Sequence, residues 1–265
     1  MADAHPLFTL TGRTALVTGA TQGIGRATVG LLLELGARVL AVARTAPDLE
    51  ARHREWSALG EAHVLAADLA TEAGRAATIA EVGARFGESL DVLVNNVGTN
   101  IRKPVDDYPL TDVQRLMAVN VESAYGLAQG LRELLMDSAG GGCVVNVSSV
   151  ASVNVVGTST VGYAMSKGAL DNLTKWLAVA WGRRGVRVNA VLPWYTRTEL
   201  TAELLERAEL RGAVEAVTPL GRVAEAREVA AAIAMLCMPG ASYINGATLA
   251  VDGGYLVRGI GRVGA

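Results

Sequence analysis

The sequence predicts an α/β fold, a doubly wound parallel sheet of about seven strands with helices on both faces. Short β-prone apolar runs alternate with helical patterns along the chain. Several runs, such as Val39-Leu-Ala-Val42, are apolar at every position, which is typical of parallel strands buried on both faces. The alternation continues without a linker, a charge block or a low-complexity tract, so we expect one domain over residues 1–265.

Each expected strand is a short β-prone run between two helical patterns. The seven runs cover residues 14–18, 38–43, 63–68, 90–95, 142–148, 187–192 and 248–252. In sheets of this kind ligands bind beyond the carboxyl ends of the strands, and the motifs below lie at or just after those ends.

A glycine-rich turn, Gly19-Ala-Thr-Gln-Gly23-Ile-Gly25, directly follows the first strand and leads into a helical pattern that ends near Gly36. Glycines allow a tight turn and bring backbone N–H groups against a pyrophosphate at a helix N-terminus, where the helix dipole favours negative charge. A purely structural turn is the alternative, which the position after the first strand disfavours.

Tyr163 and Lys167 lie four residues apart at the start of a helical stretch, so both side chains project from one face about one turn apart. An ammonium beside a phenol favours the phenolate. We therefore expect Lys167 to lower the pKa of Tyr163 toward the range in which a general acid and base works. Without support elsewhere in the chain, a solvated surface pair would be the simpler interpretation.

These motifs belong to a larger set that occurs in a characteristic order along the chain. Its segments are Thr18-Gly-Ala-Thr-Gln-Gly-Ile-Gly25, Asn95-Asn-Val-Gly98, Val119-Asn120-Val121, Asn146-Val-Ser-Ser149, the Tyr163 and Lys167 pair, and Val251-Asp-Gly-Gly254. Together they resemble the short-chain dehydrogenase/reductase family over nearly the whole chain. The resemblance implies a Rossmann-type fold and an NAD(P)-dependent carbonyl reductase or alcohol dehydrogenase. Its substrate would be a small to medium, cyclic or hydrophobic ketone or secondary alcohol.

The resemblance also implies the catalytic roles. Tyr163 would donate a proton to a substrate carbonyl or take one from an alcohol, while Lys167 would bind the nicotinamide ribose. Ser149 would steady the developing oxyanion, and Asn120 would hold a water that links Lys167 to solvent. A helix-interior polar residue that bonds to backbone is the alternative for Asn120.

Ser149 departs from the family pattern in its spacing, because it lies 14 residues before Tyr163 rather than the usual 13. A one-residue insertion between Val150 and Gly162 would account for this. We choose Ser149 over Ser148 because neighbouring strand residues point to opposite faces.

The end of the second strand indicates the cofactor. It lacks the carboxylate that binds the ribose hydroxyls of NAD, and Arg44 there is suited to a 2′-phosphate. NADP(H) is therefore favoured over NAD(H), although Gln22 stands where NADP-preferring members often carry a second basic residue in the glycine turn. An arginine that caps the sheet edge is the alternative. Asp68 resembles the family's adenine-contacting aspartate, with a helix N-cap as its alternative.

The residues expected to contact the cofactor lie in these motifs and around residue 195. They are Gly19, Thr21, Gln22, Gly23, Ile24, Gly25, Arg44, Asp68, Leu69, Asn96, Val97, Gly98, Tyr163, Lys167, Pro193, Thr196 and Thr198.

The segment Pro193-Trp-Tyr-Thr-Arg-Thr198 replaces the Pro-Gly of most family members and resembles the tropinone-reductase-like branch. By that match Thr196 and Thr198 would hold the nicotinamide carboxamide, and residues from about 195 to 220 would form a mobile substrate lid. The expected substrate pocket comprises Ser149, Val150, Tyr163, Trp194 and Tyr195. The alternative for Trp194 is an indole that packs under the lid as core.

Composition narrows the partners. There are 24 basic and 26 acidic residues without a Lys/Arg-rich cluster, so no nucleic-acid or anionic-membrane partner is expected. We see no signal segment and no apolar run of about 18 residues, and expect a cytoplasmic protein. We expect Cys143 and Cys237 to be reduced core residues. The histidines, His5, His53 and His63, form no ligand-spaced cluster, so no metal is expected.

Helices expected around residues 111–136 and 161–183 form subunit faces in many family members, so the resemblance implies a homotetramer or a homodimer. The small, apolar-rich run at 169–180 would allow close packing there. Two other functions remain open: a non-catalytic dinucleotide-binding sensor or scaffold, and a reductase of C=N or C=C bonds.

Overall fold

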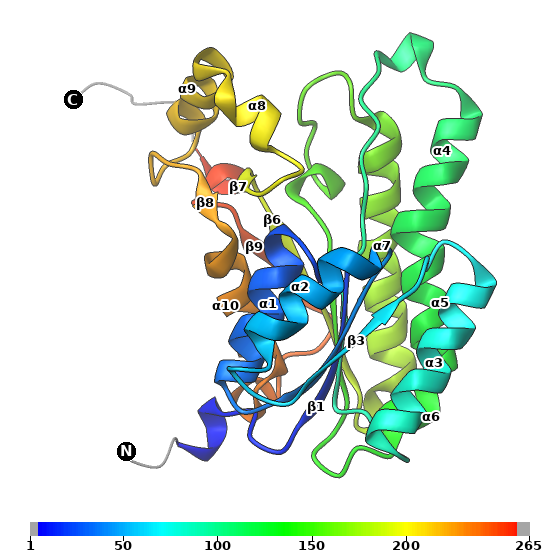
Figure 1. Ribbon diagram of the computed structural model, residues 1–265. Coiled ribbons are helices and arrows are strands. Elements are labelled where there is room, and N and C mark those ends of the chain that lie inside the picture. The colour runs from blue at the N-terminus through cyan, green and yellow to red at the C-terminus, as the bar shows by residue number, and fades with distance from the viewer. Residues whose placement is uncertain (1–4, 259–265) are drawn as a thin grey trace.

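A seven-stranded sheet forms the centre of the structure, a computed structural model that describes residues 5–258 (Figure 1). All its neighbouring strands are parallel, in the order β3-β2-β1-β4-β5-β6-β9. The strands are β1 (Thr14–Thr18), β2 (Arg38–Ala43), β3 (Ala62–Ala66), β4 (Val92–Asn95), β5 (Cys143–Val147), β6 (Arg187–Pro193) and β9 (Thr248–Val251). The doubly wound fold class predicted from the sequence is confirmed.

Helices cover both faces of this sheet (Figure 1). One face carries α1 (Gly23–Glu34), α2 (Ala46–Trp56) and α10 (Ala226–Cys237). The other carries α3 (Glu72–Phe86), α4 (Leu110–Met117), α5 (Ser123–Gly130), α6 (Arg132–Met136) and α7 (Val161–Trp181).

The two faces of the sheet bury separate hydrophobic cores. In β1, Val17 packs into the core under α1 and α10, whereas its neighbour Leu16 packs into the core under α5 and α7. Successive residues of a strand point to opposite faces, so a strand covered on both sides must be apolar at consecutive positions. This explains the unbroken apolar runs in the sequence.

The helical segment expected around residues 111–136 is present, but it is not one regular α-helix. After α4 the chain forms a π-helical turn (Ala118–Glu122) before α5 begins, and Leu131, with φ −99° and ψ 5°, separates α5 from α6. A π turn inserts one residue into a helix, and such turns are frequent at functional sites. Asn120 lies inside this one.

The segment after β6 rises above the carboxyl ends of the strands. It contains a short two-stranded sheet of β7 (Thr196–Arg197) and β8 (Ala224–Glu225), with α8 (Ala202–Glu206) and α9 (Ala208–Val217) between them (Figure 1). Single helical turns complete the chain: η1 (Pro6–Phe8), η2 (Val105–Asp107), η4 (Val150–Ser152), η5 (Gly182–Arg184), η6 (Pro239–Ala241) and η7 (Tyr255–Val257). None of the helices described in residues 5–258 has the length and apolar character needed to span a membrane.

Candidate active site

A cavity of about 180 Å³ opens at the carboxyl ends of the strands. It brings together twelve of the residues singled out from the sequence: Ile24, Asn96, Gly98, Ser149, Val150, Tyr163, Lys167, Pro193, Trp194, Tyr195, Thr196 and Thr198. The others do not line it. They lie in the glycine turn, just after β2, β3 and β4, or in the π-helical turn.

Tyr163 and Lys167 occupy the first turns of α7. The Lys167 ammonium lies 5.6 Å from the centre of the Tyr163 ring, and it donates a 2.7 Å hydrogen bond to the carbonyl of Val147 at the end of β5. Both residues line the cavity, and Lys167 is the more deeply buried of the two. A Cβ atom at Gly98 would lie 3.3 Å from Lys167 Nζ, so the glycine leaves that nitrogen accessible from the β4 side.

Burial dominates the protonation of both groups. It lowers the pKa of Lys167 to about 8, against the opposing charge of Asp171. It raises the pKa of Tyr163, while the Ser149 hydroxyl and the Arg102 charge lower it. The net lowering expected for Tyr163 is therefore wrong for this geometry, because the cost of burying a phenolate exceeds the help from its neighbours.

Ser148 and Ser149 point in different directions at the end of β5. The Ser148 hydroxyl donates to the backbone carbonyl of Lys167 at 3.2 Å, which ties β5 to α7. Ser149 begins η4, where its Oγ accepts a 3.2 Å hydrogen bond from the Ala151 N–H and lies beside Tyr163. Both serines line the cavity, but the Ser148 hydroxyl is bonded to α7, so the choice of Ser149 as the residue that contacts substrate stays a prediction.

Asn120 uses its amide to hold the chain after β4. Its Oδ1 accepts from the Thr99 N–H at 2.8 Å, and its Nδ2 donates to the Thr99 carbonyl at 3.0 Å and to Ser166 Oγ at 2.9 Å. Both amide protons are thus used. Asn120 therefore acts as a helix-interior polar residue that bonds to backbone, which is the alternative considered for it. Water binding by Asn120 stays a prediction. A water would have to bond to the second lone pair of Oδ1 or to the backbone of the π turn.

The glycine turn is shaped to receive a dinucleotide. Gly19 has φ +63°, and a Cβ atom at Gly25 would lie only 2.2 Å from the Gly19 carbonyl oxygen. Asn96 fixes the turn because its Nδ2 donates to the carbonyls of Thr18 and Gly19, both at 3.0 Å. The bare turn leads into α1, whose first N–H groups have no acceptor within the helix. These features fit a pyrophosphate.

Thr21, Gln22 and Gly23 complete this turn. Gln22 occupies the N-cap position of α1 without a side-chain cap hydrogen bond. Gly23 has φ +49°, and a Cβ atom there would lie 2.9 Å from the Thr198 side chain. The segment that follows β6 therefore lies directly against the glycine turn.

Arg44 is exposed directly after β2, and the Ala20 N–H donates to the Val42 carbonyl at 3.1 Å, which holds the glycine turn close by. Among residues 5–258, no carboxylate forms a salt bridge with Arg44. Its guanidinium is therefore available to a phosphate.

Asp68 and Leu69 follow β3, which ends at Ala66 rather than at residue 68 as expected. Asp68 Oδ1 accepts from the Ala70 N–H at 3.1 Å, while the cap of α3 is Thr71, whose Oγ1 accepts from the Gly74 N–H at 3.0 Å. The alternative role of Asp68 as N-cap is therefore wrong.

Trp194 serves both of the roles considered for it. Its indole stacks on Tyr255 with ring centres 3.6 Å apart, and its Nε1 donates to Thr218 Oγ1 at 3.0 Å, yet it also lines the cavity. Tyr195 meets it edge-on at 4.8 Å. The indole is thus a cavity wall that is anchored from behind.

Thr196 and Thr198 belong to a loop that is held by hydrogen bonds between its own residues. Thr196 Oγ1 donates to the Trp194 carbonyl at 3.0 Å, and Thr201 Oγ1 donates to the Thr196 carbonyl. Thr198 Oγ1 and Thr201 Oγ1 lie 3.2 Å apart. This network fixes the loop at the rim of the cavity.

Sequence reasoning missed several cavity residues, among them Asn100, Arg102, Val156 and Thr160. Asn100 and Arg102 come just after Asn95-Asn-Val-Gly98 at the carboxyl end of β4, where a ligand is expected. That position was the available signal. Val156 and Thr160 lie in the loop between η4 and α7, and no motif marks them.

Cysteines and possible metal ligands lie outside this cavity. Cys143 and Cys237 are both buried and unbridged. In the described part of the chain, no group of three or more His, Cys, Asp or Glu residues is placed to hold a metal ion.

Comparison with known proteins gives similarity over nearly the full length. A family model described as enoyl-(acyl carrier protein) reductase matches residues 19–256. A tropinone reductase homologue of Arabidopsis thaliana is 44% identical over 253 residues, which cover 95% of this chain and 93% of the relative.

Solved structures agree with this. One is a putative NAD(P)-dependent gluconate 5-dehydrogenase from Beutenbergia cavernae with bound NADP, with a TM-score of 0.89, 36% identity, and coverage of 95% of this chain and 100% of the other. Another is a gluconate 5-dehydrogenase from Burkholderia cenocepacia in complex with NADP and tartrate, with a TM-score of 0.88, 33% identity, and coverage of 96% and 99%.

Proposed function

The chain belongs to the short-chain dehydrogenase/reductase family of NAD(P)-dependent oxidoreductases, and on that premise we propose that it interconverts a ketone and a secondary alcohol, with Tyr163 as general acid and base. The observation that carries this proposal is the single cavity lined by Tyr163, Ser149 and Lys167, with the Lys167 ammonium held by the Val147 carbonyl. The substrate is a small to medium ketone or alcohol with a cyclic or hydrophobic body that packs against Trp194.

The protein's own groups supply proton transfer and orientation. When bound, the nicotinamide cofactor supplies or accepts the hydride. Tyr163 gives its proton to the carbonyl oxygen in reduction and takes it back from the alcohol in oxidation. Ser149 donates a hydrogen bond to the same oxygen, where negative charge develops. Lys167 adds a positive charge and a hydrogen-bond donor on the side of Tyr163 that faces the end of β5.

The proposed cofactor is NADP(H) rather than NAD(H). Arg44 is exposed and free of a described carboxylate partner at the end of β2, where a 2′-phosphate would lie. The solved relatives from Beutenbergia and Burkholderia are described with NADP. The pyrophosphate of the cofactor would lie against Gly19, Gly23, Gly25 and Asn96. Its nicotinamide would lie against Thr196 and Thr198.

Residues 1–265 would act as one domain, with residues 195–220 as a lid. Leu205, Val214 and Val223 form a small apolar cluster of their own that packs on Trp194 and Tyr195. The lid therefore touches the body of the protein at the wall of the cavity. We expect it to move over bound substrate.

The description of the family model favours one other reaction, the reduction of a C=C bond. A hydroxyl beside the phenol suits a carbonyl oxygen, because it provides two donors to one developing oxyanion. We therefore place carbonyl reduction first.

The test is a turnover screen that follows nicotinamide absorbance with NADPH and NADP. The panel contains ketones, secondary alcohols, enones and imines, and products are identified by mass. Turnover of ketones or alcohols supports the proposal. Products reduced only at C=C or C=N would replace it, and cofactor binding without turnover of any compound would indicate a sensor or scaffold.

A further inference from the structure

The cavity has an unbalanced set of charges. Its lining contains two cationic side chains, Arg102 and Lys167, and no described carboxylate. Lys167 is buried and already bonded to the Val147 carbonyl at 2.7 Å. Arg102 is exposed at the mouth. The charge available to an incoming substrate is therefore that of Arg102.

The backbone on both sides of Arg102 is held in place. The Tyr108 hydroxyl donates to the Ile101 carbonyl at 3.0 Å, and the Lys103 N–H donates to the Ser159 carbonyl at 3.0 Å. The second bond joins this segment to the loop that leads into α7 and Tyr163. Arg102 thus projects from a fixed position toward the site.

The cavity that Arg102 lines also contains two phenols, those of Tyr163 and Tyr195. Burial raises the pKa of Tyr163 and of Tyr195, and the positive charge of Arg102 opposes that rise in both. Tyr163 belongs to α7 and Tyr195 to the loop after β6. Arg102, Tyr163 and Tyr195 all line the same cavity, so the guanidinium is available to a ligand that contacts either phenol.

Arg102 has no acidic partner in residues 5–258. Neighbouring cations do have one: Lys103 pairs with Asp112 at 2.6 Å and Arg197 with Glu225 at 3.1 Å.

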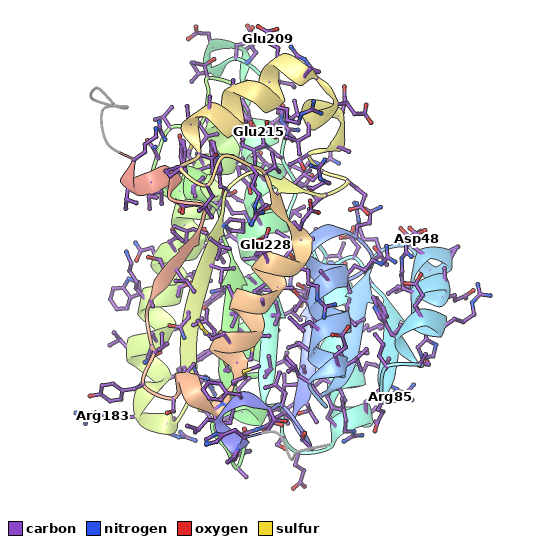
Figure 2. All side chains as sticks on the ribbon, turned by 90° about the vertical axis from the view of Figure 1, so that its left-hand side faces the viewer. Asp48, Arg85, Arg183, Glu209, Glu215 and Glu228 are labelled. Carbon is purple, nitrogen blue, oxygen red and sulfur yellow. The ribbon has the colours of Figure 1, made fainter. Side chains whose placement is uncertain are left out.

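The carboxylates of α9 and α10 are not part of the cavity lining. Figure 2 shows Glu209 and Glu215 on α9 and Glu228 on α10, and none of the three is part of the cavity wall. Glu228 forms a salt bridge with Arg222 at 2.6 Å. The wall therefore offers nothing to neutralise a bound ammonium.

We propose that Arg102 binds an anionic group of the substrate, so that the ketone or secondary alcohol turned over here carries a carboxylate. This inference rests on the proposed function and adds the substrate class to it. A guanidinium forms two parallel hydrogen bonds to a planar carboxylate. A single cation matches the single charge of a carboxylate better than the double charge of a phosphate. An ammonium-bearing ketone would meet a like charge.

The experiment uses matched substrates and matched variants. An oxo carboxylic acid, its methyl ester and a ketone with an ammonium group in place of the carboxylate are compared, with an oxo phosphate ester as the second anion. The variant is Arg102→Gln. The control is Lys103→Gln. It removes a positive charge from the neighbouring residue, whose ammonium already forms a salt bridge with Asp112.

We expect the parent protein to prefer the oxo acid to its ester and the ester to the ammonium ketone in kcat/KM. Arg102→Gln should lower kcat/KM for the acid by roughly tenfold or more, mainly through KM, and leave the ester within about threefold. Lys103→Gln should keep the preference for the acid. Added salt should weaken binding of the acid and not of the ester, because the guanidinium is exposed.

Three results would overturn the inference. The first is an equal loss of kcat/KM for the acid and the ester in Arg102→Gln, and the second is a preference of the parent protein for the phosphate ester over the acid. The third is a larger dissociation constant for NADPH in Arg102→Gln by fluorescence titration, which would make Arg102 a cofactor contact. The proposed function fails separately: there, neither acid nor ester is turned over by the parent protein although NADPH binds.

Discussion

Lys167 is a charged residue in a place where charge is costly. Burial lowers its pKa from 10.5 to about 8, so between those pH values the unfolded chain binds the proton more tightly than the folded one. The free energy of unfolding therefore rises with pH across that window, and below it the full penalty of about 3 kcal/mol remains. Lys167 thus lowers stability at neutral pH, a cost often met at functional sites.

We predict that Lys167→Met is inactive but more stable at pH 7, by roughly 1–3 kcal/mol after the loss of the hydrogen bond to Val147. The gain should shrink as pH approaches 10.5. Thermal melts of parent and variant at several pH values measure it. Lys175→Met, which replaces an exposed lysine two turns further along α7, is the control and should show no such trend. A variant less stable than the parent at pH 7 would contradict the account of burial.

Arg44 is the residue on which cofactor choice depends. We predict that the parent protein binds NADPH more tightly than NADH, and that Arg44→Asp reverses the order, with a change of about tenfold or more in the ratio of dissociation constants. The new carboxylate repels the 2′-phosphate and accepts from the ribose hydroxyls.

Fluorescence titration with both cofactors measures this ratio. Arg54→Asp makes the same charge change at an exposed position near the end of α2 and should leave the order unchanged. Equal affinities for the two cofactors in the parent protein would refute the assignment.

Individual site residues could be predicted from the sequence where a motif marks them. Ser149, Tyr163 and Lys167 reach one cavity because each follows a strand end or begins the helix after it. The pKa of Tyr163 could not be predicted, because it depends on how deeply the phenol is buried. Arg102 was missed although it lies just after the motif at the carboxyl end of β4. Its place in the cavity also depends on the hydrogen bond from the Lys103 N–H to the Ser159 carbonyl, which joins segments remote in sequence.

Among the elements, strands were easier to predict than the long helical segment. All seven expected strands exist, with ends that differ by no more than two residues. The break at 118–122 was not visible, because a π turn adds one residue to a pattern that remains helical on either side. The bonds from Asn120 to Thr99 and Ser166 that accompany it join distant parts of the chain.

The loop after β6 and the lid meet at Trp194. The indole stacks on Tyr255 and also packs against the lid cluster that contains Leu205. We predict that Trp194→Gly raises KM for hydrophobic ketones more than for small polar ones, with little change in NADPH affinity. It should also lower the melting temperature, because burial of this side chain contributes about 1–3 kcal/mol.

Steady-state kinetics on two ketones and a thermal melt separate these effects. Trp194→Phe keeps an aromatic ring for the stack on Tyr255 but removes the donor to Thr218 Oγ1, and should retain most of the substrate preference. A loss of the same size for every substrate, in step with the melting temperature, would assign Trp194 to packing alone.

At the scale of the whole molecule, the strand and helix alternation was enough to predict the parallel sheet and its two covered faces. Assembly is not visible in one chain, but α7 carries large apolar residues on its outside. Trp176 and Val179 are 71% and 80% exposed, and Met165 on the same helix is also exposed. Exposed apolar patches of this kind mark interaction surfaces.

We predict a homotetramer or a homodimer in which this outer face of α7 is buried. The double substitution Trp176→Glu and Val179→Lys should shift the mass measured by light scattering toward the monomer. Leu59→Lys, which changes an exposed apolar residue just after α2 on the opposite side of the sheet, should not (Figure 1). A monomeric parent protein at micromolar concentration would contradict the prediction.

The most direct measurement of the central claim is turnover by Tyr163→Phe, with NADPH affinity measured on the same protein. The substitution removes the hydroxyl that transfers the proton and little of the surface that meets the cofactor. The account predicts that kcat for any accepted ketone falls by roughly 10²–10⁴-fold, while the dissociation constant for NADPH stays within about threefold. Tyr125→Phe, an exposed tyrosine on α5, should keep full activity. Turnover by Tyr163→Phe comparable to that of the parent protein would contradict Tyr163 as the general acid and base.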